Sequence, residues 1–166
     1  TMSDNIRVGL IGYGYASKTF HAPLIAGTPG MALAAVSSSD AAKVHADWPS
    51  VPVVSEPKHL FNDPNIDLIV IPTPNDTHFP LAKAALEAGK HVVVDKPFTV
   101  TLSQARELDA LAKSLGRLLS VFHNRRWDAD FLTLQALIAE GRLGRIVRFE
   151  SHFDRYRPCL LYTSDA

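Results

Sequence analysis

The stretch that most constrains this chain is Ile6–Ser17, which reads IRVGLIGYGYAS. An apolar run, Val8–Ile11, leads into two glycines one residue apart, Gly12 and Gly14, and then into helix-compatible sequence. This pattern predicts a strand, a tight turn and the start of a helix. Such a turn directs backbone N–H groups and the positive end of the helix dipole at one point, where a pyrophosphate fits. An ordinary strand-to-helix turn is the alternative.

The rest of the chain alternates strand and helix patterns. Near-continuous apolar runs, typical of strands buried in a parallel sheet, occur at Val8–Ile11, Met31–Val36, Val51–Val54, Leu68–Ile71, His91–Val94 and Leu118–Phe122. Helical patterns cover Ala16–Ile25, Asp40–Asp47, Glu56–Asn62, about Thr77 to Gly89, Thr101 to Gly116 and Asp128 to Gly141. This order predicts an α/β fold, a doubly wound parallel sheet of the Rossmann type with helices on both faces.

Prolines and caps refine the expected helices. Phe20, Leu24 and Ile25 are expected to form the buried stripe of the first helix, which Pro23 kinks or restarts. Pro80 is expected in the first turn of its helix, where a missing N–H is tolerated. Thr101 and Gln104 have the spacing of a capping box, and Asp128 can cap the last helix.

The pattern changes near the end of the sequence. Residues 146–153 alternate apolar and polar side chains with a period of two, which predicts a half-exposed strand. We interpret it as the first strand of a second α/β domain. The expected boundaries are a dinucleotide-binding domain over 5–123, a linking helix and the start of the second domain over 124–158, and a tail over 159–166. The tail fits neither pattern, and we expect it to be foreign to a truncated reading frame.

The amino-acid composition limits the classes of partner that we expect. Seventeen basic and seventeen acidic residues balance, so charge gives no reason to expect nucleic acid or a membrane surface. No apolar run approaches the roughly 20 residues of a membrane span. The single cysteine, Cys159, forms no internal disulfide, which fits a cytoplasmic location. The histidines at positions 21, 45, 59 and 152 lack partners at metal-ligand spacing, so no metal site is expected. The expected partner is a small molecule.

Ligands of doubly wound sheets bind beyond the carboxyl ends of the strands. The residues that follow the predicted strands are therefore the candidates for the site. Those expected to bind a dinucleotide are Gly12, Gly14, Tyr15, Ala16, Ser37, Ser38, Lys43, Thr73, Pro74, Asn75, His78, Asp95, Lys96, Pro97, Asn124 and Arg126. Ser17 stands where a third glycine or alanine is usual, and its small side chain still lets helix and strand pack closely.

The residues after the second strand bear on the choice between NAD and NADP. A carboxylate there would bond the 2′-hydroxyl of NAD and repel the 2′-phosphate of NADP. This chain has Ser37, Ser38 and Ser39, followed by Asp40 and by Lys43 nearby. Hydroxyl donors and an ammonium suit a phosphate better, so we favour NADP. The alternative is a serine-rich turn in which Asp40 caps a helix.

The residues expected to face the nicotinamide of the dinucleotide follow the fourth and fifth predicted strands. Prolines make the Thr73–Asn75 loop a rigid wall, and His78 either lines that wall or caps its own helix. Lys96 directly follows a buried strand and precedes Pro97, so we expect it partly buried and in range of proton transfer. A solvated lysine paired with Asp95 is the alternative.

The last predicted strand is followed by Asn124, Arg125 and Arg126. Adjacent side chains point in different directions, so at most one of the two arginines is expected to face the substrate.

Three segments together resemble the Gfo/Idh/MocA family of NAD(P)-dependent oxidoreductases. They are GLIGYGYASKTFHAPLI, IPTPNDTHFPLAKAALEAGKHVVVDKPFTVT and FHNRRWD, and the likeness covers about residues 5 to 158. The resemblance implies a second α/β domain with a large, mostly antiparallel sheet, and homo-oligomers of the full-length form. It also implies hydride transfer between NAD(P) and a hydroxyl or carbonyl of a sugar or polyol. Lys96 matches the family lysine that contacts substrate and nicotinamide ribose, and Asp95 replaces the commoner glutamate.

The main departure of the sequence from the family is a missing histidine. The histidine that serves the family as general acid/base comes from the second domain, and nothing in this sequence matches it. We therefore expect the chain to bind NADP or NAD weakly and to turn over nothing. A non-catalytic dinucleotide-sensing module is the first alternative, and a methyltransferase-type nucleotide fold is the second.

Overall fold

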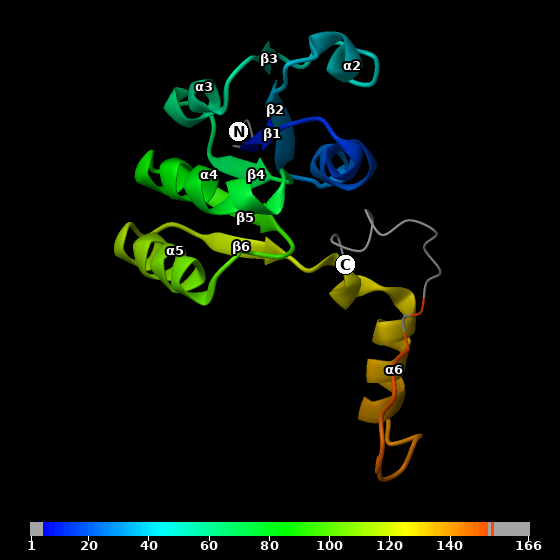
Figure 1. The fold of residues 1–166 in the computed structure, drawn as a ribbon. Helices are drawn as coiled ribbons and strands as arrows, with labels where there is room; N and C mark the ends of the chain where they lie inside the picture. The colour runs from blue at the N-terminus through cyan, green and yellow to red at the C-terminus, as the bar shows by residue number, and fades with distance from the viewer. Residues whose placement is uncertain (1–4, 153, 155–166) are drawn as a thin grey trace. The chain divides into compact units, whose positions relative to one another are not determined.

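The computed structural model describes residues 5–152 and 154, and the chain divides between His123 and Asn124 into two compact units. The first unit is built on one parallel sheet, shown in Figure 1. Its strands are β1 (Ile6–Ile11), β2 (Met31–Ser37), β3 (Val53–Val54), β4 (Leu68–Ile71), β5 (His91–Asp95) and β6 (Leu119–Phe122). They lie in the order β3-β2-β1-β4-β5-β6, and every neighbouring pair is parallel. The predicted α/β doubly wound sheet is confirmed.

Helices cover both faces of this sheet. The helices of the first unit are the π-helix η1 (Ser17–His21), α1 (Ala22–Gly27), α2 (Ala41–His45), α3 (Pro57–Asn62), α4 (Asn75–Glu87) and α5 (Leu102–Ser114). One core cluster packs α3, α4 and α5 against the sheet through residues such as Leu60, Leu86 and Leu108. A second cluster packs α1 and α2 on the other face through Ile25 and Val44. Two apolar layers therefore enclose the strands, as their apolar sequences require.

The first helix differs from the prediction. It continues from η1 into α1 with helical backbone at His21 and Ala22, and Pro23 lies in the first turn of α1, so the helix does not restart there. Its buried side carries Ser17, His21, Ala22 and Ile25, whereas Phe20 and Leu24 of the predicted stripe are exposed. A stripe counted at a regular period of 3.6 therefore misplaces Phe20 and Leu24 across the five π-helical residues, while Ile25 is buried as predicted.

Two further helix starts test the predictions made for Thr101 and for Pro80. Thr101 and Gln104 form the predicted capping box at the start of α5. The helix α4 begins at Asn75, two residues earlier than expected, so Pro80 lies inside it rather than in its first turn. The earlier start arises because Pro74, with an extended backbone, takes the position before the helix, and the Thr77 N–H donates to its carbonyl at 2.9 Å.

The second unit is described by itself. Its described residues contain a 3-10 turn, η2 (Asn124–Trp127), and a helix, α6 (Ala129–Ala139). Asp128 precedes α6, but its carboxylate accepts from Arg125 Nη1 at 2.8 Å instead of capping the helix. Residues 146–152 form no strand, in contrast to the prediction from their alternation. A strand needs a hydrogen-bonded neighbour, and no described residue of the unit supplies one. The predicted tail over 159–166 lies outside the described residues.

Candidate functional site

The turn after β1 lies where the strand order reverses. Strands β1 and β4 are neighbours, but the chain runs from β1 to β2 on one side and from β4 to β5 on the other. Gly12 has a φ of 79°, a left-handed conformation that favours glycine, and its N–H donates to the Ser37 carbonyl at 2.7 Å. A methyl group on Gly14 would meet no atom within 4 Å, so the backbone there is open to approach.

The loop after β4 adjoins this turn. A Cβ added to Gly12 would lie 3.9 Å from Thr73 Cγ2, so the two loops are in contact distance. The Thr73 hydroxyl lies 2.6 Å from the Thr77 hydroxyl, which in turn donates to the Pro74 carbonyl at 2.6 Å. Asn75 is the first residue of α4. The Thr73–Asn75 loop is therefore held by bonds to the first turn of its own helix.

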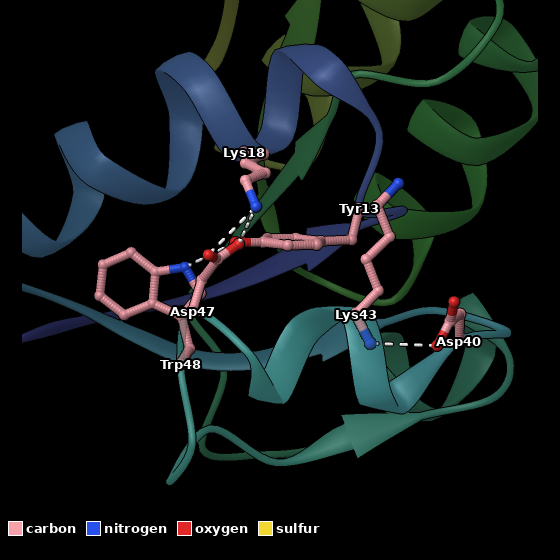
Figure 2. Close-up of polar contacts among 6 residues, drawn as sticks. All are labelled: Tyr13, Lys18, Asp40, Lys43, Asp47 and Trp48. Atoms are coloured by element: carbon pink, nitrogen blue, oxygen red, sulfur yellow. Dashed lines mark hydrogen bonds and ion pairs between the residues drawn. The ribbon is translucent and has the colours of Figure 1, made fainter.

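A cluster of four side chains anchors the glycine turn, and Figure 2 shows it. This anchor cluster consists of Tyr13, Lys18, Asp47 and Trp48. The Tyr13 hydroxyl donates to Asp47 Oδ2 at 2.9 Å and accepts from Trp48 Nε1 at 2.8 Å. Lys18 Nζ, from η1, pairs with the same carboxylate at 2.8 Å. The middle residue of the Gly-x-Gly turn is thus bound to the segment that follows α2.

Electrostatics of the anchor cluster follow from these bonds. Burial raises the pKa of Tyr13, and its bond to the Asp47 carboxylate raises it further, while donation from Trp48 acts in the opposite sense to a smaller degree. Hydrogen bonds from Lys18 and then from Tyr13 hold the pKa of Asp47 below its ordinary value. The cluster therefore keeps a neutral phenol beside an ionised carboxylate, which is occupied by its own donors.

The segment after β2 contains the residues predicted to select between NAD and NADP. Ser37 is buried, and the Ser38 hydroxyl accepts from the Asp40 N–H at 3.1 Å. Asp40 caps α2 by accepting from the Lys43 N–H at 3.0 Å, as the serine-rich-turn alternative describes. The Lys43 side chain is exposed and extends away from Asp40 (Figure 2). The Asp40 carboxylate thus accepts a hydrogen bond from the backbone of α2, whereas the Lys43 ammonium faces solvent.

Asp95 ends β5 and connects Lys96 with the first helix. Its Oδ1 accepts from the Lys96 backbone N–H at 2.8 Å, and its Oδ2 lies 3.5 Å from His21 Nε2. The His21 ring packs on Phe122, the last residue of β6, at a centroid distance of 4.4 Å. Burial alone would raise the pKa of Asp95, but the bonds from His21 and the Lys96 N–H outweigh it and leave this pKa lowered.

Lys96 and Pro97 are exposed in the turn after β5. The partial burial expected for Lys96 is therefore wrong for this side chain. Its neighbour Asp95 uses both carboxylate oxygens on the Lys96 backbone and on His21, so Asp95 holds the backbone of the turn rather than the ammonium. A lysine so placed extends into solvent at the carboxyl edge of the sheet.

His78 lies under the loops rather than on them. It is the fourth residue of α4 and is 0% exposed. Its Nε2 lies 2.8 Å from the Thr73 carbonyl oxygen, and its Nδ1 lies 2.8 Å from that of Pro97. Both polar atoms of the ring are therefore occupied by backbone. We interpret His78 as a residue that joins two loops of the site, in place of the wall or cap suggested by its position in the sequence.

Two of the remaining candidates follow the glycine turn in the first unit, and the other two lie in the second unit. Tyr15 is 77% exposed and makes an edge-to-face contact with Phe20, and Ala16 is partly buried beside it. Asn124 and Arg126 belong to η2 of the second unit, where Asn124 is partly buried and Arg126 is exposed. Arg125, between them, pairs with Asp128.

Sequence reasoning missed the anchor cluster and the contact of His21 with Asp95. The sequence does carry a signal for His21. It lies four positions after the small Ser17, so the two residues share one face of the helix. Within residues 5–152 and 154, no three His, Cys, Asp or Glu side chains gather closely enough to hold a metal ion. In the same part of the chain, no helix combines the length and apolar character that crossing a membrane requires.

Comparisons with known proteins bear on this geometry. Residues 6–123 match the model of the GFO_IDH_MocA family, described as an oxidoreductase family with an NAD-binding Rossmann fold. The uncharacterized oxidoreductase YdgJ of Escherichia coli K12 is 87% identical over 95% of this chain and 45% of its own length. The scyllo-inositol 2-dehydrogenase (NADP(+)) IolW of Bacillus subtilis is 41% identical over 93% of this chain and 43% of its own.

A solved structure agrees with these matches. A protein from Yersinia pestis, described as an oxidoreductase, superposes with a TM-score of 0.93 at 77% identity, over 96% of this chain and 46% of that one. This chain therefore spans about half the length of the curated relatives it matches.

Proposed function

This chain belongs to the Gfo/Idh/MocA family of oxidoreductases, and we propose that it is the nucleotide-binding part of an enzyme acting on a sugar or polyol. The reaction is hydride transfer between NAD(P) and a hydroxyl or carbonyl of that substrate. The observation that carries the proposal is the open Gly12–Gly14 turn at the reversal of strand order, with Lys96 at the same edge of the sheet.

The residues around the turn fit a dinucleotide. The first N–H groups of a helix have no partner within it, and here Tyr15, Ala16 and Ser17 begin a helix directly after the glycines. Open space at Gly14 lets a pyrophosphate approach the backbone. A bound nicotinamide would supply or accept the hydride. The rigid Thr73–Asn75 loop adjoins the glycine turn and is proposed as the wall of the nicotinamide pocket.

Lys96 is the proposed catalytic residue. An exposed ammonium at the carboxyl edge of the sheet can donate hydrogen bonds to the reacting oxygen of a substrate and stabilise negative charge on it. Asp95 and Pro97 fix the backbone on either side, and Asn124 or Arg126 is proposed to contact substrate or cofactor. The general acid/base of the family has no match in this sequence, so we expect binding without turnover by this chain.

We propose NADP as the preferred cofactor. Ser38 and the exposed Lys43 follow β2, and the Asp40 carboxylate between them is engaged in capping α2. A 2′-phosphate suits this set better than a diol. The relative IolW, whose name specifies NADP(+), supports the same preference. We further propose a cytoplasmic location and homo-oligomers of the full-length form.

Titration of the 166-residue chain with NADPH and NADH, followed by nicotinamide fluorescence, tests the proposal. We expect NADPH to bind more tightly, and Lys43→Glu to weaken NADPH binding roughly tenfold while changing NADH little, because it places a negative charge beside the 2′-phosphate. Lys58→Glu, an exposed lysine on α3, is the matched control. Equal affinity for the two cofactors would contradict the NADP preference. Binding of S-adenosylmethionine and of neither cofactor would contradict the whole assignment.

A further inference from the structure

His78 occupies a position that the proposed function leaves unexplained. It is fully buried, and its two ring nitrogens lie 2.8 Å from the carbonyl oxygens of Thr73 and Pro97. The first oxygen belongs to the loop after β4 and the second to the turn after β5. We call this pair of contacts the His78 tie.

The two loops joined by the tie have different places in the proposed site. Thr73 lies beside the glycine turn, with its Cγ2 3.9 Å from a Cβ built on Gly12. Pro97 directly follows Lys96, whose own N–H is held by the Asp95 carboxylate. Any shift of His78 would therefore change the spacing between the wall loop and the backbone of the lysine.

We propose that His78 is a positioning residue, which fixes the Lys96–Pro97 turn relative to the Thr73 loop through the contacts of its two ring nitrogens with the Thr73 and Pro97 carbonyls. This inference rests on the proposed function, because it concerns the placement of Lys96. It does not make His78 a ligand of the cofactor, since a fully buried ring with both nitrogens occupied has no polar atom left for one.

The chemistry of the acceptors limits what the ring can do. A carbonyl oxygen only accepts hydrogen bonds, so a ring nitrogen bonds to it only through an N–H. Each of the two contacts at 2.8 Å is therefore either a hydrogen bond donated by the ring or a ring nitrogen packed directly against the loop backbone. In both cases the ring fills the space between the two carbonyls, and replacing its nitrogens removes the contacts that hold the loops at this spacing.

Nuclear magnetic resonance of the labelled chain tests this directly. Long-range ¹H–¹⁵N spectra identify which nitrogen of the His78 ring donates to its carbonyl. The carbonyl ¹³C shifts of Thr73 and Pro97 report the two acceptors, and the Phe98 amide shares the Pro97 peptide group. Thr73 and Pro97 carbonyl shifts that both stay unchanged when His78 is replaced would overturn the proposal.

Two variants then test positioning. His78→Phe keeps a ring of similar shape without donors, and His78→Gln restores a donor to one side. We expect the Phe variant to shift both carbonyls and the Lys96 amide, and to weaken NADPH binding about tenfold. The Gln variant is expected to recover one carbonyl shift. His59→Phe, an exposed histidine on α3, is the matched control and is expected to change neither.

The outcomes separate this inference from the proposed function. If the wild-type chain does not bind NADPH, the proposed function fails, while the ring and carbonyl spectra still decide whether the tie exists. If wild type binds NADPH and His78→Phe leaves the Lys96 amide unshifted, the positioning role is wrong. Should the Phe variant not fold, the wild-type ring spectrum and the Gln variant decide between the two outcomes.

Discussion

Two polar arrangements hold the loops at the carboxyl edge of the sheet, and they do so in opposite ways. The anchor cluster joins side chains to side chains, with charged groups that are partly open to water: the Lys18 and Asp47 side chains are 52% and 31% exposed. The His78 tie joins one fully buried ring to two backbone carbonyls. Water competes for the bonds of the first arrangement and is excluded from the second. The cost of losing each should differ accordingly.

The largest effect is expected from removing the His78 tie. His78→Ala leaves the Thr73 and Pro97 carbonyls without their partner and opens a cavity beside α4, which together should lower the free energy of unfolding by about 3–5 kcal/mol. Chemical denaturation followed by circular dichroism measures it. His59→Ala, on the surface of α3, is the control. An equal loss in both variants would contradict the distinction between buried and exposed polar groups.

The middle effect is expected from the phenol of the anchor cluster. Tyr13→Phe removes one donor to Asp47 and the acceptor of Trp48 but keeps the packed ring, so we expect a loss of about 1–2 kcal/mol at neutral pH. The folded-state pKa of Tyr13 is raised. The advantage of wild type is therefore fully present below the ordinary value of 10.0 and is lost as pH rises through the folded pKa. Unfolding curves for both proteins at neutral pH and well above the ordinary pKa of tyrosine test this. A difference that persists unchanged at high pH would contradict it.

The sheet itself could be predicted because its strands are short apolar runs that recur along the chain. A run such as Leu68–Ile71 is short and apolar throughout, which is typical of a strand covered on both faces, and the structure has a strand with those bounds. The loops that follow the strands were predictable for the same reason, since parallel strands bring their carboxyl ends to one edge. These features depend on local pattern and on topology alone.

The polar contacts could not be predicted in the same way. Tyr13 and Asp47 are 34 positions apart, and nothing in their local sequence marks them as partners. His78 was interpreted from its neighbours along α4, whereas its second acceptor lies 19 positions away on Pro97. The partner of a polar side chain depends on the register of several elements at once. The prediction for residues 146–152 failed for a related reason, because alternation predicts a strand only where a neighbouring strand is present.

The smallest effect is expected from the charges of the anchor cluster, and a second ion pair calibrates it. A double-mutant cycle with Lys18→Met and Asp47→Asn measures their coupling, and one with Lys83→Met and Glu107→Gln measures an exposed pair between α4 and α5 at 2.8 Å. We expect stronger coupling in the first cycle, because the Tyr13 hydroxyl fixes the Asp47 carboxylate, and weaker coupling of both in high salt.

The pH dependence of the first cycle has a definite sign. The pKa of Asp47 is lowered, so its contribution is present above the ordinary value of 3.8 and is lost as pH falls through the folded pKa. Unfolding measured for both cycles across that range tests the assignment. Equal coupling in the two cycles would mean that Tyr13 orients nothing, and the anchor cluster would then be an ordinary surface ion pair beside a buried phenol. Coupling that is larger only while Tyr13 is present, and that falls to the level of the Lys83 pair in Tyr13→Phe, would show that the middle residue of the glycine turn gives the exposed charges their geometry.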